Sequence, residues 1–243
     1  METNNRNDSI NPLRYARTGG VLYLMMIACG IVNEMFIRGV IIVPADAAAT
    51  AVNLNIMETT WRAGIALEML MVILTVCLSL VLYVLTRPVQ KALAQLALIF
   101  SLLAIGVQAA YTLHLMEAIF PLGNSKYLSS FTVAQLQALS NMSIEAHGLG
   151  FAIALLLFGP FFFITGYLIY YSGYLPKVLG LLYVIAGLSY FISSFVLILA
   201  PAFGAKYYFF IAGPALIGEL GLSLWLLIKG VDAKRWNMVI NNN

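Results

Sequence analysis

The sequence predicts an all-α, polytopic membrane protein: a bundle of six transmembrane helices with short connections and one or two helices on the outer surface. Two observations lead to this fold class. Of the 243 residues, 62% are hydrophobic and only 9% are charged, whereas soluble domains contain roughly 25% charged residues. The apolar residues are also gathered into long runs, and the mean hydropathy is +0.92. This composition excludes an ordinary soluble domain.

The apolar runs have the length that a membrane crossing requires. The hydrocarbon core of a bilayer is about 30 Å thick and an α-helix rises about 1.5 Å per residue, so one crossing takes roughly 20 residues. The predicted spans are 19–42, 61–85, 92–119, 146–171, 177–200 and 207–228. The segments between them contain Pro, Gly or charged residues, which interrupt apolar helices.

Outside the spans, the chain contains two tails and two longer connections. We expect a cytoplasmic N-terminal tail over 1–18, a six-helix transmembrane domain over 19–229 and a cytoplasmic C-terminal tail over 230–243. The segment Pro44–Thr60 is rich in Ala, which favours a short surface helix. Thr132 and Gln135 have the spacing of a capping box, so a helix is expected to begin before the fourth span.

The distribution of cations predicts the orientation. If the N-terminus is cytoplasmic, nine Lys and Arg residues lie inside and four lie outside. The inner cations are Arg6, Arg14, Arg17, Arg87, Lys91, Lys177, Lys229, Lys234 and Arg235. The outer cations are Arg38, Arg62, Lys126 and Lys206. Cytoplasmic segments of membrane proteins carry an excess of Lys and Arg, so both termini are expected in the cytoplasm.

A small set of ionisable side chains lies within the predicted spans or at their outer ends. A charged side chain at the centre of such a helix costs about 2.5–3.5 kcal/mol on insertion scales. This cost is tolerable only if the groups face one another, a water-filled cavity or a ligand. The candidate ligand-binding or polar-network residues are Glu34, Arg38, Arg62, Glu68, His114, Glu117, Glu145, His147 and Glu219. All but Glu219 lie toward the outer side, which predicts a polar cavity in the outer leaflet half.

Several of these residues occur in motifs that resemble a known family. The motifs are "NEMFIRG", "VPADAAATAVNL", "WRAGIALEM", "LYVLTRPVQKALAQLAL" and "EAHGLGF…GYLIYYSGYLPKVLG". Together they resemble the bacterial membrane proteins grouped as domain of unknown function 4386, from about Arg14 to Ala200. The resemblance implies a six-helix protein of the bacterial plasma (inner) membrane, and it implies no particular activity. The matching polar positions are Glu34, Arg38, Asp46, Arg62 and His147. Ala152 departs from the family pattern, which often has an acid shortly after the His-Gly element.

Three classes of function fit this polar set. The first is a binding or transport protein whose outer cavity takes a small amphiphile, a lipid or a cation. Its polar lining would be Glu34, Arg38, Arg62 and Glu68. The second is an intramembrane enzyme that acts on a lipid-like substrate, with His147 and Glu145 as acid and base; catalytic residues are otherwise unassigned. The third is a structural membrane protein whose buried ion pairs clamp the helices together.

The sequence offers little support for a metal site or a cofactor, and we expect neither. A metal site needs three or four converging His, Asp, Glu or Cys side chains, and the chain has two histidines and no HExxH motif. It also contains no phosphate loop, dinucleotide fingerprint or nucleic-acid-binding pattern. Membrane lipids and a small amphiphilic ligand are therefore the expected partners, and no nucleic acid is expected. The sequence leaves the oligomeric state open.

The first local expectation concerns the charged pair in the first span. Glu34 and Arg38 are four residues apart and can pair on one helix face. We expect Arg62 and Glu68, on the neighbouring antiparallel helix, to complete their network.

The second local expectation concerns Glu219, near the middle of the sixth span. No Lys, Arg or His lies within one turn of it on its own helix. Because loss of hydration favours the neutral form of a carboxyl group, we expect Glu219 to be protonated at neutral pH. Its expected partner is a backbone carbonyl freed by Pro160 or Pro214, since proline cannot donate the usual helical hydrogen bond.

Overall fold

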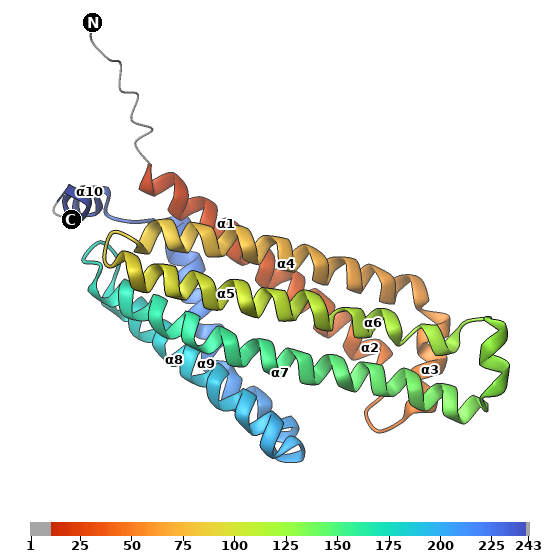
Figure 1. The fold of residues 1–243 in the computed structure, drawn as a ribbon. Helices are drawn as coiled ribbons and strands as arrows, with labels where there is room; N and C mark the ends of the chain where they lie inside the picture. The colour runs from red at the N-terminus through yellow and green to blue at the C-terminus, as the bar shows by residue number, and fades with distance from the viewer. Residues whose placement is uncertain (1–10, 242–243) are drawn as a thin grey trace, which may run out of the picture.

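The computed structural model describes residues 11–241, and every regular element in this part of the chain is a helix (Figure 1). The long helices are α1 (Pro12–Val32), α4 (Glu58–Thr86), α5 (Lys91–Tyr111), α7 (Val133–Tyr171), α8 (Lys177–Leu199) and α9 (Pro201–Ile228). The shorter elements are η1 (Asn33–Arg38), α2 (Gly39–Ile41), α3 (Ala47–Ile56), α6 (Leu113–Glu117), η2 (Phe120–Leu122), η3 (Lys126–Ser130) and α10 (Ala233–Asn241). The predicted all-α fold class is confirmed.

Six stretches within residues 11–241 are long and apolar enough to cross a membrane. They are Pro12–Ile41, Glu58–Thr86, Lys91–Leu122, Val133–Tyr171, Lys177–Leu199 and Phe210–Ile228. The six predicted spans are thereby confirmed, although several helices begin earlier than their apolar runs. Asn11 explains this for α1, because its side chain accepts hydrogen bonds from the amides of Leu13 and Arg14 and so caps the helix. Part of the expected tail over 1–18 is therefore helical, while residues 1–10 and 242–243 lie outside the described part.

The fourth long helix, α7, is much longer than a membrane crossing. Its 39 residues extend about 58 Å, against about 30 Å for the hydrocarbon core. The predicted capping box starts it: the Thr132 hydroxyl accepts from the Gln135 amide, and the Gln135 side chain accepts from the Thr132 amide. The α7 helix is therefore long enough to extend beyond the hydrocarbon core.

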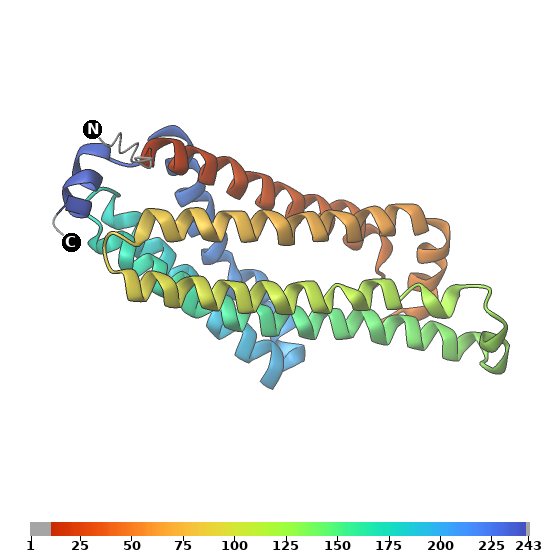
Figure 2. The same ribbon diagram turned by 45° about the horizontal axis from the view of Figure 1, so that its top comes forward.

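The two ends of the bundle differ in structure (Figures 1 and 2). The start of α1 and the helix α10 lie at one end, which we call the terminal end, and α3 lies at the other, which we call the α3 end. The α3 helix is the surface helix predicted within Pro44–Thr60, and Asp46 caps it by accepting from the Ala49 amide at 2.8 Å. The α8–α9 hairpin diverges from α1 and ends well short of the α3 end (Figures 1 and 2).

Two apolar cores fill the bundle, and a polar layer separates them. The larger core includes Tyr23, Leu78, Leu82, Phe162, Tyr183 and Leu222. The smaller core, toward the α3 end, includes Ile37, Ile41, Leu54, Trp61, Ile65 and Leu115. Along α4, for example, Ile65 belongs to the smaller core, the buried Glu68 follows, and Leu78 belongs to the larger core. The separation places charged groups between two apolar regions.

The α7 and α8 helices approach backbone to backbone where two glycines face each other. A Cβ atom on Gly166 would lie 2.7 Å from the Gly180 oxygen, and one on Gly180 would lie 2.6 Å from the Tyr170 nitrogen. Both contacts are far shorter than a real Cβ allows. Small residues at such crossings let membrane helices gain van der Waals contact.

The expected C-terminal tail over 230–243 contains the helix α10. Asp232 caps it, since Asp232 Oδ1 accepts from the amides of Lys234 and Arg235. Trp236 is 2% exposed and packs into the larger core, whereas Lys234 and Arg235 are exposed. Apolar and cationic faces on one short helix are typical of segments that lie in the membrane interface.

Candidate functional site: a buried charge network

The candidate site begins at a change of helical geometry in the first span. The η1 segment is a π-helical turn between α1 and α2, in which the Gly39 amide donates to the Glu34 oxygen five residues earlier. π-helical turns are rare and often occur at functional sites. Because each extra residue turns a helix by about 100°, this turn decides which way the side chains near Arg38 face.

Arg38 links two carboxylates of very different exposure. Its Nε and Nη2 atoms donate to Glu34 Oε2 at 2.9 and 2.8 Å. Its Nη1 atom donates to Glu68 Oε2 at 2.6 Å. The Glu34 side chain is 64% exposed and the Glu68 side chain only 4%. Arg38 therefore connects a carboxylate on the surface of the bundle to one in its interior.

Glu68 also has a hydrogen-bond partner in the fourth span. His147 Nε2 lies 3.1 Å from Glu68 Oε1 and 3.5 Å from Arg38 Nη1. An ionised carboxylate can only accept hydrogen bonds, so His147 Nε2 is the donor when Glu68 is ionised. We call this group the Arg38–Glu68–His147 network. It joins η1, α4 and α7, and it balances a buried negative charge that would otherwise be very costly.

Sequence reasoning missed three side chains of the site: Asn33, Tyr111 and Thr112. The Asn33 amide donates to Glu68 Oε2 at 3.4 Å, and the Thr112 hydroxyl donates to Oε1 at 3.5 Å. The Tyr111 ring packs edge-on against His147, with 4.7 Å between ring centroids. Asn33 could have been predicted from the sequence. A side-chain amide inside an apolar span requires a hydrogen-bond partner, as does the acid beside it.

The structure does not bring Arg62 to the network, contrary to expectation. Both its Nε and Nη2 atoms lie 2.8 Å from Glu58 Oε1, and its side chain is 51% exposed. Positions 62 and 68 of α4 differ by six residues, about 240° around the helix axis. When Glu68 faces the interior, Arg62 therefore cannot. The expected pairing of Glu34 with Arg38, and of this pair with Glu68, is present.

The remaining outer residues lie apart from the network. His114 Nδ1 lies 2.6 Å from Glu117 Oε2 in an exposed pair on α6. Glu145 is exposed and accepts from Asn141 at 2.9 Å. Since Glu145 and His147 are two residues apart on one helix, they point in nearly opposite directions. The structure therefore does not assemble Glu145 and His147 as an acid–base pair.

Glu219 lies in a second polar cluster in the larger core. The Tyr190 hydroxyl donates to Glu219 Oε1 at 2.6 Å, so its partner is a phenol from α8 and not the expected backbone carbonyl. Nearby, the hydroxyls of Tyr23 and Tyr183 lie 2.8 Å apart, and the Phe162 ring packs against both Tyr183 and Tyr190. The α7 and α9 helices continue through Pro160 and Pro214.

The described part of the chain contains no group of side chains suited to bind a metal ion. Among residues 11–241, no three His, Cys, Asp or Glu side chains converge in a way that could hold a metal ion. The chemistry available at the Arg38–Glu68–His147 network is that of charge and proton binding.

Fold and site together define a class: a polytopic helical membrane protein with a buried Glu68–His147 ion pair that Arg38 connects to the surface. A sequence profile described as Domain of unknown function (DUF4386) matches residues 18–230. The chain belongs to this family, which confirms the resemblance seen in its motifs. No curated protein and no solved structure matches the chain.

Proposed function

We propose that the protein binds a small amphiphilic cation at Glu34, as the first step of transport or sensing across the membrane. The observation that carries this proposal is the exposure of Glu34. Its side chain is 64% exposed, and Met35 and Phe36 beside it are equally exposed and apolar. A carboxylate flanked by exposed apolar side chains is complementary to a molecule with one positive group and an apolar body.

The charge balance of the network also favours a cation. Glu34 and Glu68 carry two negative charges, and Arg38 carries one positive charge. Arg38 and its two carboxylate partners therefore carry one negative charge in excess. Uncompensated charge is costly where water is scarce, so a ligand cation at Glu34 relieves that cost.

Tetraphenylphosphonium, an apolar cation, is a suitable probe. In equilibrium dialysis with the purified protein in detergent, Glu34→Gln is expected to weaken its binding by about tenfold, or about 1.4 kcal/mol. This is a modest value for a charge interaction near a protein surface. Tetraphenylborate, which has nearly the same shape and the opposite charge, is expected to bind less tightly to the native protein.

Glu58→Gln is the matched control for this experiment. Glu58 is also an exposed acid that pairs with an arginine four residues later, but it lies outside the network. Glu58→Gln is expected to leave the affinity for tetraphenylphosphonium unchanged. Equal losses in the two variants, or equal binding of the two probe ions, would contradict the proposed site.

We further propose that the protein resides in the bacterial plasma membrane with its terminal end in the cytoplasm. The cations near the terminal end among the described residues are Arg14, Arg17, Arg87, Lys91, Lys177, Lys229, Lys234 and Arg235. In the same part of the chain, the acid nearest to them is Asp232, which caps α10. An excess of cations on one side of the bundle favours the cytoplasm for that side.

Cysteine labelling tests this orientation. In a variant that lacks Cys29 and Cys77, single cysteines at Ala48 and Lys126 are expected to react with a membrane-impermeant maleimide on intact cells. Both residues are exposed near the α3 end. A cysteine at Lys234, on α10, is expected to react only after the membrane is disrupted. The reverse pattern would show that the proposed orientation is inverted.

A further inference from the structure

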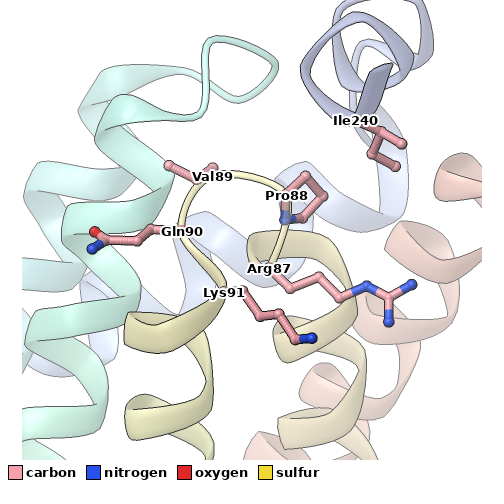
Figure 3. A pocket seen from close by; sticks show the side chains of 6 residues that line it. All are labelled: Arg87, Pro88, Val89, Gln90, Lys91 and Ile240. Atoms are coloured by element: carbon pink, nitrogen blue, oxygen red, sulfur yellow. The ribbon is translucent and has the colours of Figure 1, made fainter. Parts of the chain in front are cut away.

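A cavity lies at the terminal end, remote from the charge network. It has a volume of about 530 Å³, and its lining residues are Arg87, Pro88, Val89, Gln90, Lys91 and Ile240. The first four form the turn from α4 to α5, Lys91 begins α5, and Ile240 belongs to α10. The side chains of Arg87 and Lys91 extend to the same side of the turn, whereas Gln90 points the other way (Figure 3).

Among residues 11–241, the two cations of the cavity have no acidic partner, because no carboxylate lies within ion-pair distance of Arg87 or Lys91. Asp232, the nearest acid in sequence to α10, binds Arg235 and the first amides of α10. Arg87 and Lys91 therefore create a positive site that an anion can neutralise.

The start of α5 adds further donors to the same place. Gln90, the residue before this 21-residue helix, makes no capping hydrogen bond with its side chain. Helical hydrogen bonding begins with the Ala94 amide, which donates to the Gln90 oxygen. The amides before it are the unpaired donors that every helix start presents, and the helix dipole makes this end partly positive. Helix starts of this kind bind phosphate groups.

The position of the cavity indicates where the anion comes from. Arg87 directly follows the span Glu58–Thr86, and Lys91 begins the span Lys91–Leu122. The cavity therefore lies at the membrane boundary, at the level of lipid headgroups. Below it, Leu80 on α4 and Ile99 on α5 are exposed apolar side chains that acyl chains can cover. Ile240 supplies an apolar wall on the side of α10.

We propose that this cavity binds the phosphate group of an anionic phospholipid, with Arg87 and Lys91 as its positive partners. Basic pockets between transmembrane helices are known to hold anionic headgroups. Ile240 of α10 lines one side of the site, so lipid binding and the docking of α10 support each other. This site is separate from the proposed cation site at Glu34.

Native mass spectrometry of the detergent-purified protein tests the proposal with dioleoylphosphatidylglycerol as the probe. Arg87→Gln/Lys91→Gln is expected to weaken its binding by roughly 30-fold, because each cation near an anionic lipid contributes about a factor of five. The charge-preserving variant Arg87→Lys/Lys91→Arg is expected to bind nearly as well as the native protein. Dioleoylphosphatidylcholine, which has the same chains and no net charge, is expected to bind the native protein weakly.

Lys229→Gln/Lys234→Gln is the matched control. It removes the same two charges from the terminal end, at residues that do not line the cavity, and is expected to leave the affinity within about twofold of native. An equal loss of lipid affinity in both double variants would show that the lipid is held by general charge attraction. That result would overturn the specific site. Displacement of the lipid by millimolar inorganic phosphate would assign the cavity to free phosphate and overturn the lipid assignment.

Discussion

Replacing Arg38 by leucine is expected to lower the free energy of unfolding by about 3–5 kcal/mol. The change removes the 2.6 Å ion pair to Glu68 and leaves a carboxylate that is only 4% exposed without its arginine partner. Breaking a buried ion pair costs this much because the abandoned charge has lost its water and its counter-charge together. In detergent, the thermal midpoint should fall by roughly 10 °C for a chain of this size.

Two further variants make the Arg38 experiment decisive. Arg62→Leu removes the same type of side chain from an exposed pair with Glu58, and exposed pairs contribute about 0–1 kcal/mol. Its midpoint is therefore expected to stay close to native. In Arg38→Leu/Glu68→Met, the stranded carboxylate is gone, and much of the lost stability should return. A fall of similar size for Arg38→Leu and Arg62→Leu would show that the buried network is not the source of the stability.

Replacing Gly180 by alanine is expected to destabilise the protein by about 1–3 kcal/mol, the usual cost of overpacking. The added methyl group would lie 2.6 Å from the Tyr170 nitrogen and 2.7 Å from the Gly166 oxygen. These are backbone atoms, so no side chain can rotate away and the helices α7 and α8 must separate. Intrinsic helix propensity alone predicts that the substitution stabilises the protein, because alanine is favoured over glycine by about 1 kcal/mol in a helix.

Gly106→Ala is the control for this prediction. Gly106 lies in α5, and a Cβ atom there would meet nothing within 4 Å. With no contact to disturb, the gain in helix propensity should leave the thermal midpoint unchanged or slightly raised. If both substitutions raised the midpoint, the close approach of α7 and α8 would not be a determinant of stability.

The sequence by itself determined the fold class, the six spans and the start of the helix that leads into the fourth span. The bilayer has a fixed thickness and demands about 20 apolar residues per crossing, so hydropathy along the chain is enough to locate the spans. The capping box is equally local, because Thr132 and Gln135 bond to each other's backbone. No contact between distant segments is needed for these predictions.

The partners of the buried polar groups were decided only by the tertiary structure. Both Arg38 and Arg62 lie near acids in the sequence, yet Arg38 reaches the buried Glu68 and Arg62 remains at the surface with Glu58. Which residue points inward depends on the rotation of each helix about its axis, and the π-helical turn at Asn33–Arg38 changes that rotation. Hydropathy does not reveal such a turn.

The same reason explains the neighbours of His147 and Glu219. Glu145 is near His147 in the chain but lies on the other side of α7, while Glu68 meets His147 from a different helix. Glu219 binds the Tyr190 hydroxyl of α8. From the sequence, the backbone carbonyls freed by the two prolines had been the expected partners. A buried polar group takes the partner that helix packing brings within about 3 Å, and that packing is a property of the whole bundle.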